Sequence, residues 1–227
     1  MDLAQHYQQL WTRSVQQFES GHFEYDVMLD APVDSRRGIT LLARPPLPVR
    51  EAVEIMLADF KASAPEQYYY PITDIHLTVL SIISCYEGFS LSLIDTVRYT
   101  ALIREVVNAQ KIFKIQFRGI TASPSCLLIQ GFPLDSTLKK IRNSLRQRFR
   151  NSGLQHSIDK RYAIQTAHST VVRFRKPFVH PEAFIQKAKH YRAVDFGTFD
   201  ITEMELVFND WYQKAENTVG LKRFRLG

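Results

Sequence analysis

Apolar residues recur along the chain in two periods, one typical of helices and one typical of strands. Helical spacing predicts an N-terminal amphipathic helix over residues 3–18 and a second helix that begins at Pro48. The same spacing predicts helices within residues 91–110 and over residues 136–150. Pro181 begins a short helix that runs toward Tyr191. The predicted helices are spread over the whole chain and are separated by strands and loops.

Alternating or continuously apolar runs between these helices predict strands. They are GITLLARP (38–45), KIFKIQFRGI (111–120), CLLIQGFP (126–133) and FDITEMELVFNDW (199–211). Two further strands are predicted to carry His76 and His168. Residues 21–37 hold Asp30, Pro32 and Asp34, which predict an irregular arm. Mixed helices and strands in this order indicate the α+β class.

Two parts of the chain repeat the same order of elements. GITLLARP, a helix, a loop and HLTVL form one unit, and CLLIQGFP, a helix, a loop and HSTVV form the other. Few residues are identical between them, so the pattern repeats and not the sequence. The simplest architecture is bilobal, with two pseudo-twofold related antiparallel-sheet lobes, helices on the outside and a central groove. We expect residues 1–37 to form an N-terminal helix and arm. Residues 38–227 then form the bilobal domain, with one lobe around His76 and the other around His168.

Composition narrows the function classes. The chain has 227 residues, of which 45% are hydrophobic and 23% charged, as in ordinary globular proteins. A net charge of +6 favours an anionic partner such as a phosphate ester or RNA, although a solvated surface produces the same excess. The two cysteines have no metal-ligand spacing and fit a reducing compartment. The sequence shows no signal-peptide pattern and no apolar run long enough to cross a membrane, so we expect a cytoplasmic protein without a membrane partner.

The candidate chemistry lies in the His-x-Thr pattern that ends both repeated units. Side chains alternate along a strand, so His76 shares a face with Thr78, and His168 shares a face with Thr170. Two imidazoles supply a general base and a general acid near neutral pH, and two hydroxyls hold the nonbridging oxygens of a phosphate. Such a set suits the attack of water on a phosphodiester without a metal. A single histidine of this kind is more often a hydrogen-bonded core residue, and it is the pair with its matched threonines that favours catalysis.

Together, HLTVL and HSTVV resemble the paired motifs of the 2H phosphoesterase superfamily, which includes the LigT-like 2′,3′-cyclic nucleotide phosphodiesterases, also called 2′–5′ RNA ligases. The resemblance covers roughly residues 38–211 and implies a bilobal α+β fold that works without metal or cofactor. It implies that His76 and His168 are the acid–base pair, without assigning the base, and that Thr78 and Thr170 bind phosphate. The implied substrate is a 2′,3′-cyclic phosphate or a related nucleotide or RNA-end phosphodiester. The N-terminal extension marks a bacterial-type member.

Five further residues are candidates for substrate binding. Three arginines flank the first predicted strand and suit an anion geometrically, namely Arg36, Arg37 and Arg44. Ion pairs with Asp30 or Asp34 explain them equally well. Tyr70 and Tyr162 precede the two motifs and are candidates to stack on a base, with ordinary packing as the alternative.

Other function classes are weighed against this hypothesis. The main alternative is a non-catalytic nucleotide- or RNA-binding module that uses the same groove. A metal-dependent hydrolase requires more ligands than Asp74 beside His76, and a serine hydrolase is disfavoured because no G-x-S-x-G occurs. The basic face of the 136–150 helix, which includes Arg142, is expected to be solvated rather than to bind RNA. No obligate protein partner is inferred.

Overall fold

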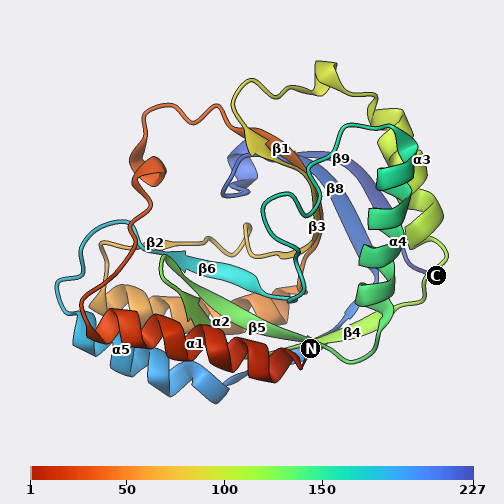
Figure 1. Cartoon of the computed structure of the whole chain (residues 1–227). Helices are drawn as coiled ribbons and strands as arrows, with labels where there is room; N and C mark the ends of the chain where they lie inside the picture. The colour runs from red at the N-terminus through yellow and green to blue at the C-terminus, as the bar shows by residue number, and fades with distance from the viewer. Residues whose placement is uncertain (1) are drawn as a thin grey trace.

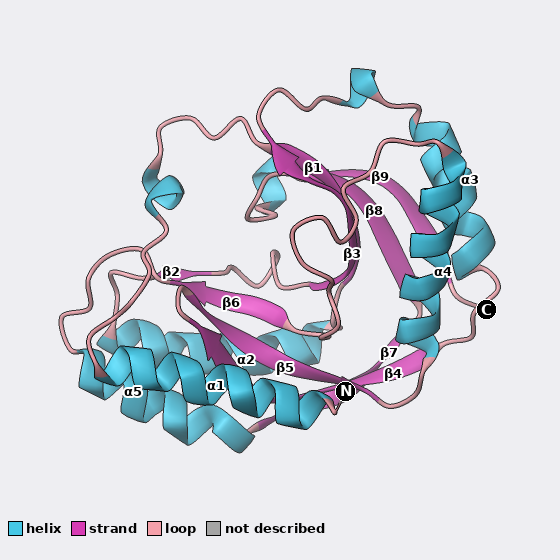
Figure 2. Cartoon of the chain, viewed as in Figure 1, coloured by secondary structure: helices cyan, strands magenta, loops and turns pink. Residues whose placement is uncertain are grey.

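Two antiparallel β-sheets, each covered by helices on its outer side, form the framework of the computed structural model, which describes residues 2–227 (Figures 1 and 2). The four-stranded sheet has the order β3-β1-β8-β9, and the five-stranded sheet has the order β2-β6-β5-β4-β7. The strands are β1 (Arg37–Ala43), β2 (Tyr68–Tyr69), β3 (Leu77–Tyr86), β4 (Phe113–Ser123), β5 (Cys126–Pro133), β6 (Ser169–Arg173), β7 (Asp195–Ile201), β8 (Glu203–Asn209) and β9 (Val219–Arg225). The helices are α1 (Leu3–Glu19), α2 (Leu47–Ser63), α3 (Thr96–Val107), α4 (Thr137–Ser152) and α5 (Pro181–His190). The expected α+β architecture with outer helices is confirmed.

The helices begin where the sequence supplies a partner for their free amide groups. Asp2 caps α1 by accepting a hydrogen bond from the Ala4 amide at 2.9 Å, and Asp95 caps α3 in the same way. Pro48 and Pro181 lie in the first turns of α2 and α5, where the missing amide hydrogen costs nothing. No helix within residues 2–227 is long and apolar enough to cross a membrane.

Two helices pack against the sheet to which the strand before them does not belong. Helix α2 follows β1 of the four-stranded sheet, yet it contacts β7 and α5 beside the five-stranded sheet, to which the next strand, β2, belongs. Helix α4 connects β5 to β6, yet it contacts α3 and β3 beside the four-stranded sheet (Figure 1). One hydrophobic cluster consequently includes Leu41 of β1, Phe60 of α2 and Ile129 of β5. This exchange of helices ties the two sheets together through a shared core.

The single strand predicted over residues 199–211 is wrong. The segment forms β7, which pairs with β4 in one sheet, and then β8, which pairs with β1 in the other. The buried positions change phase at Thr202, from Phe199 and Ile201 to Met204 and Leu206. A strict alternation leaves these residues on opposite faces, so the chain has to turn and change sheets.

Smaller differences concern strand ends. His76 and His168 immediately precede β3 and β6 instead of lying within them. The short strand β2 and the C-terminal strand β9 were not predicted, because Tyr68–Tyr69 is too brief for a periodic signal and Val219–Arg225 is largely exposed.

Gly119 occupies a crowded bend in β4, where the pairing with both neighbouring strands shifts register. Its φ is +69°, and its amide donates to the carbonyl of Val194 at 2.7 Å. An added Cβ would collide with the carbonyl oxygen of Arg192. Gly153, at the end of α4, has nearly the same φ of +68°, but an added Cβ there meets nothing within 4 Å. An alanine at either position is strained by the positive φ, but only an alanine at position 119 also collides with a neighbouring backbone.

We predict that Gly153→Ala lowers the free energy of unfolding by about 1 kcal/mol, the cost of a left-handed alanine. Gly119→Ala adds the crowding against Arg192 and should cost about 1–3 kcal/mol more. Urea unfolding of both variants measures the difference. Equal losses in the two variants would contradict the crowding at Gly119.

Candidate active site

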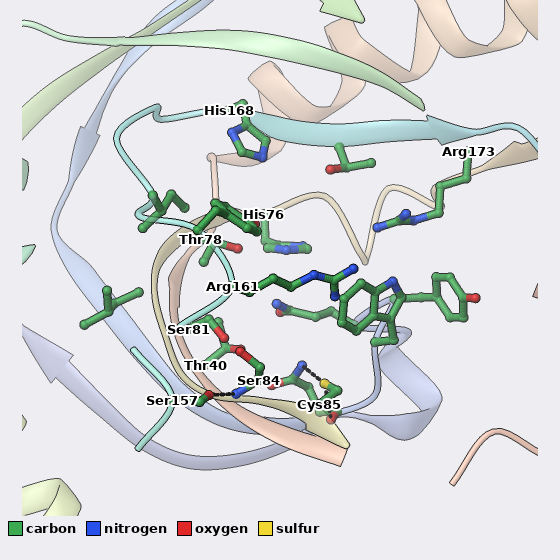
Figure 3. A pocket seen from close by; sticks show the side chains of 18 of the residues that line it. Thr40, His76, Thr78, Ser81, Ser84, Cys85, Ser157, Arg161, His168 and Arg173 are labelled. Carbon is green, nitrogen blue, oxygen red and sulfur yellow. Dashed lines mark hydrogen bonds between the residues drawn. The ribbon is translucent and has the colours of Figure 1, made fainter. Parts of the chain in front are cut away.

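The two His-x-Thr segments meet in one pocket between the sheets. His76, Thr78, His168 and Thr170 all line a cavity of about 160 Å³ (Figure 3). Thr78 is the second residue of β3, and Thr170 is the second residue of β6. The pocket therefore draws one hydroxyl from each sheet and one imidazole from the segment that leads into each of these strands.

Strand β3 presents a polar residue to the pocket at every third position. Its pairing with β1 skips Val79 and Ile82, which are both fully buried. Each skipped residue is a β-bulge that shifts the alternation of the strand by one position. As a result, Thr78, Ser81 and Ser84 all line the cavity. We call these three residues the hydroxyl row.

A bulge in β6 brings Arg173 to the site. The pairing of β6 with β5 skips Val171, so Thr170 and Arg173 both line the pocket although they are three positions apart. The Arg173 Nε donates to the hydroxyl of Tyr70 at 2.8 Å, and its Nη1 lies 3.6 Å from the Asp26 carboxylate. Strict alternation places Arg173 on the face opposite Thr170, which is why the sequence analysis missed it.

His76 has a defined tautomer when it is neutral. Its Nδ1 lies 2.6 Å from the carbonyl oxygen of Asp74. A carbonyl only accepts, so Nδ1 carries the proton and Nε2 keeps a free lone pair. Burial lowers the pKa of His76 to about 4, and the nearby charges of Arg44 and Arg173 act in the same direction.

The Nδ1 atom of His168 contacts a hydroxyl group where that of His76 contacts a carbonyl. Its Nδ1 lies 2.6 Å from the hydroxyl of Thr166, a group that both donates and accepts. Burial lowers the pKa of His168 to about 4, and the positive charge of Arg142 contributes next. His76 also contributes to this shift, because the two imidazoles face the same pocket. At neutral pH, both rings are uncharged in the free protein.

The remaining candidates from the sequence divide into two groups. Tyr70 and Tyr162 line the pocket, Tyr162 with 63% of its surface exposed. The three arginines do not line it. Arg36 donates to both carboxylate oxygens of Asp34, at 2.8 and 2.7 Å, and Arg37 bonds to the backbone carbonyls of Asp34 and Arg36. Arg44 contacts Glu205 at 3.4 Å and the carbonyl of Thr73 at 2.8 Å.

Aromatic and basic residues that the sequence analysis did not single out also line the pocket. The Arg161 guanidinium lies 4.4 Å from the ring centre of Trp211 (Figure 3). Trp211 and Tyr212 follow β8 in an irregular segment, where no periodic pattern indicates which way a side chain points.

Within residues 2–227, no cluster of three or more histidine, cysteine or acidic side chains is placed to hold a metal ion.

Two buried amide oxygens without a hydrogen-bond partner among residues 2–227 belong to residues that line this pocket. They are Oδ1 of Asn209 and Oε1 of Gln213, on side chains that are only 2% and 8% exposed. Together with the hydroxyl row they form an uncharged, hydrogen-bonding lining. Such a lining suits the O–H and N–H groups of a nucleoside more than a second phosphate.

Comparison with known proteins gives a result for the fold. No protein-family model matches the sequence, and no curated protein matches it. E. coli LigT complexed with 3′-AMP matches in structure with a TM-score of 0.55 and 15% identity, over 84% of this chain and 98% of LigT. TT0787 of Thermus thermophilus matches with a TM-score of 0.54 and 16% identity, over 83% of this chain and 97% of TT0787. The chain has the LigT-like fold of the 2H phosphoesterases.

A third structure extends the same result. This chain also matches the structure of a conserved protein of unknown function from Agrobacterium tumefaciens. The TM-score is 0.53 and the identity 15%, over 91% of this chain and 96% of that protein. At these identities the likeness lies in the arrangement of the backbone. It confirms the fold expected from the paired motifs, while the roles of the individual residues rest on the pocket itself.

We predict that folding stability falls as the pH falls from about 6.5 to about 4. The pKa of both histidines is about 4 in the folded protein, below the ordinary value of about 6.5, so the unfolded chain binds more protons in this window. Each histidine contributes up to about 1.4 kcal/mol per pH unit. Urea unfolding between pH 7 and 5 should show a smaller slope in a His76→Gln/His168→Gln variant. If the variant shows the same slope of unfolding free energy against pH as the wild type, the folded protein does not disfavour the charged form of the two imidazoles.

Proposed function

We propose that the protein is a metal-independent phosphodiesterase that hydrolyses 2′,3′-cyclic phosphates or related nucleotide or RNA phosphodiester bonds. One observation carries the proposal: two imidazoles and two threonine hydroxyls, from different sheets, line one pocket together with Arg173. His76 and His168 act as the general acid–base pair. Thr78 and Thr170 bind the phosphate, and Arg173 adds a positive charge beside them.

The proposed chemistry is a displacement at phosphorus. One imidazole takes a proton from water through its free Nε2 as the water oxygen bonds to phosphorus. The other imidazole donates a proton to the ribose oxygen whose bond to phosphorus breaks. The product is a phosphomonoester with a free hydroxyl at the neighbouring ribose carbon. No electrons are transferred, and the protons balance between the two rings.

Binding of the substrate favours the protonated form of the histidine that acts as the acid. Both imidazoles are neutral in the free protein at pH 7, because burial opposes their charge and lowers the pKa of each. A bound phosphodiester carries a negative charge, which favours the imidazolium form of a neighbouring histidine. The acid is therefore charged when the anion is in place, and the pH–rate profile should be bell-shaped.

The nucleotide class of the substrate is supported from two directions. E. coli LigT, which has the same fold, has been crystallised with 3′-AMP. In this chain Ser81, Ser84, Asn209 and Gln213 offer uncharged hydrogen-bonding groups in the same pocket as Thr78 and Thr170. We propose that they contact the nucleoside, with Tyr70, Tyr162 and Trp211 on the aromatic side. Both cysteines are unpaired, which fits the proposed cytoplasmic location.

We predict that His76→Ala and His168→Ala each lower the rate of 2′,3′-cyclic nucleotide hydrolysis by about 10²–10⁴-fold, because each removes one proton-transfer group. Activity is measured on the four cyclic nucleotides and on short RNAs ending in a cyclic phosphate, with EDTA present throughout. His190→Ala is the matched control, since His190 is exposed and outside the pocket. Full activity in both pocket variants would reject the acid–base assignment. Nucleotide binding without turnover by the wild type would favour the non-catalytic binding module.

We predict that Arg173→Met lowers kcat/KM by about 10–100-fold, the effect of losing one charge-assisted hydrogen bond to the phosphate. Arg173→Lys keeps the charge and should lose less. Arg175→Met is the control, because Arg175 pairs with Asp30 on the surface and does not line the pocket. Equal kcat/KM values for Arg173→Met and Arg175→Met would remove Arg173 from the binding site.

A further inference from the structure

The three residues Thr166, Ala167 and His168, which we call the second-motif tripeptide, have no strand partners, because β6 begins only at Ser169. An irregular segment of this kind needs other contacts to hold a side chain in place. His168 nevertheless lies at the pocket, with most of its imidazole enclosed by the protein. Two side chains that are distant in sequence supply the missing contacts.

The first is Tyr7, on the N-terminal helix α1. Its side chain is fully buried, and its hydroxyl accepts a hydrogen bond from the Ala167 amide at 3.2 Å. The same hydroxyl donates to the carbonyl of Gly131 at 3.2 Å and accepts from the Gly131 amide at 3.3 Å. Burial raises the pKa of Tyr7 to about 12, so the phenol stays protonated. Tyr7 therefore attaches the tripeptide to the C-terminal half of β5.

Gly131 makes this attachment possible. A Cβ at position 131 would collide with the carbonyl oxygen of Ala167. The glycine thus lets the tripeptide approach β5 closely enough for one phenol to reach both backbones. No periodic pattern in the sequence reveals the hydrogen bonds of Tyr7, because Gly131 and Ala167 lie 124 and 160 positions away from it along the chain.

The second is Arg142, on α4. The residue is only 3% exposed, and its Nη2 donates to the carbonyl of Thr166 at 2.9 Å. Its Nη2 and Nε also donate to the carbonyls of Thr78 and Val79, at 2.9 and 2.8 Å. One guanidinium thus bonds to the backbone of both motifs. The expectation that Arg142 lies on a solvated helix face is wrong, because its side chain turns inward between the two sheets.

The contacts continue from the tripeptide backbone to the imidazole. The carbonyl that Arg142 holds belongs to Thr166, whose hydroxyl lies 2.6 Å from Nδ1 of His168. The amide that Tyr7 holds belongs to Ala167, which precedes His168 directly. His76, by contrast, rests on the carbonyl of Asp74 within its own segment and has no hydrogen bond with Tyr7. The two histidines are therefore held by different means.

We propose that Tyr7 and Arg142 are positioning residues for the second motif: α1 and α4 together orient His168, and Arg142 also fixes its distance from Thr78. This proposal rests on the proposed function, in which His168 transfers a proton. Neither residue touches the substrate. The N-terminal helix, which the sequence places outside the repeated core, then becomes a part of the catalytic apparatus.

The first experiment compares Tyr7→Phe with Tyr99→Phe. Tyr99 is equally buried, and its hydroxyl bonds to the carbonyl of Gln155 instead of to the tripeptide. Tyr7→Phe removes three hydrogen bonds of the phenol and Tyr99→Phe removes one, so both variants should lose stability in urea, and Tyr7→Phe should lose more. Only Tyr7→Phe should lower kcat, by about 10–100-fold with little change in KM, because a displaced proton donor slows chemistry more than binding. Equal kcat in the two variants would overturn the role of Tyr7.

The second experiment follows the histidines directly by NMR of the imidazole nitrogens in the whole chain. Besides Arg142, the charged or titratable groups that act on His168 are His76, Arg173 and His6. Arg142→Met removes one positive charge and should raise the pKa of His168, while that of His76 changes less because Arg142 does not act on it. Arg142→Lys keeps the charge and should leave the pKa of His168 near its wild-type value, yet lower kcat, because one ammonium cannot reach three carbonyls.

The two readouts separate this proposal from the proposed function. In Tyr7→Phe the resonances of His168 should shift, whereas those of His76 should not, and this result does not depend on activity. An unshifted His168 signal in both Tyr7→Phe and Arg142→Met overturns the positioning role. Wild-type protein that hydrolyses none of the tested phosphodiesters, with His168 still shifted in Tyr7→Phe, rejects the proposed function alone.

Discussion

The guanidinium of Arg142 is buried without a carboxylate partner among residues 2–227, and it donates to the carbonyls of Thr78, Val79 and Thr166. A buried charge is costly unless polar groups surround it, and three carbonyl dipoles provide that environment. Burial lowers the pKa of Arg142 only to about 10, so it stays charged at neutral pH. These carbonyls belong to the two segments that carry the histidines. One side chain from α4 therefore joins the two segments by hydrogen bonds.

The position of α4 follows from the exchange of helices between the sheets. Because α4 leaves the five-stranded sheet and packs beside β3, its buried face reaches the first motif from behind. Helix α1 reaches the second motif from its own side of the molecule, through Tyr7. Each motif is thus supported by an element from outside its own strand–helix–strand unit. Hydrogen bonds from these two helices can hold the two motifs in place without a disulfide bond between the sheets.

Irregular strands determine what the pocket contains. Bulges at Val79 and Ile82 in β3, and at Val171 in β6, change which residues face inward. Without them, Ser81 and Arg173 would point away from Thr78 and Thr170. Bulges also strengthen the local twist, which helps the strands curve around a small cavity. The uncharged hydroxyl row and the basic residue in the same pocket are thus products of backbone geometry.

Much of the architecture is determined by the sequence alone. Periodicity located every α-helix of residues 2–227 and most strands, and the repeated order with His-x-Thr at each end indicated two related lobes and a shared pocket. Helical and strand periods are local properties, so they survive without knowledge of the fold. The clear failure, residues 199–211, occurred where the apolar pattern changes phase at Thr202. The proposed roles of His76, Thr78, His168 and Thr170 remain a hypothesis that the pocket now makes testable.

Only the tertiary structure decided the rest. It placed Arg173 in the pocket, left Arg36, Arg37 and Arg44 outside it, and turned Arg142 inward. It also brought Tyr7 to Ala167 across 160 positions of the chain. Bulges depend on the pairing of a strand with its neighbour, and long-range hydrogen bonds depend on how helices pack. Neither leaves a periodic trace in the sequence, because both arise from contacts between segments that are far apart along the chain.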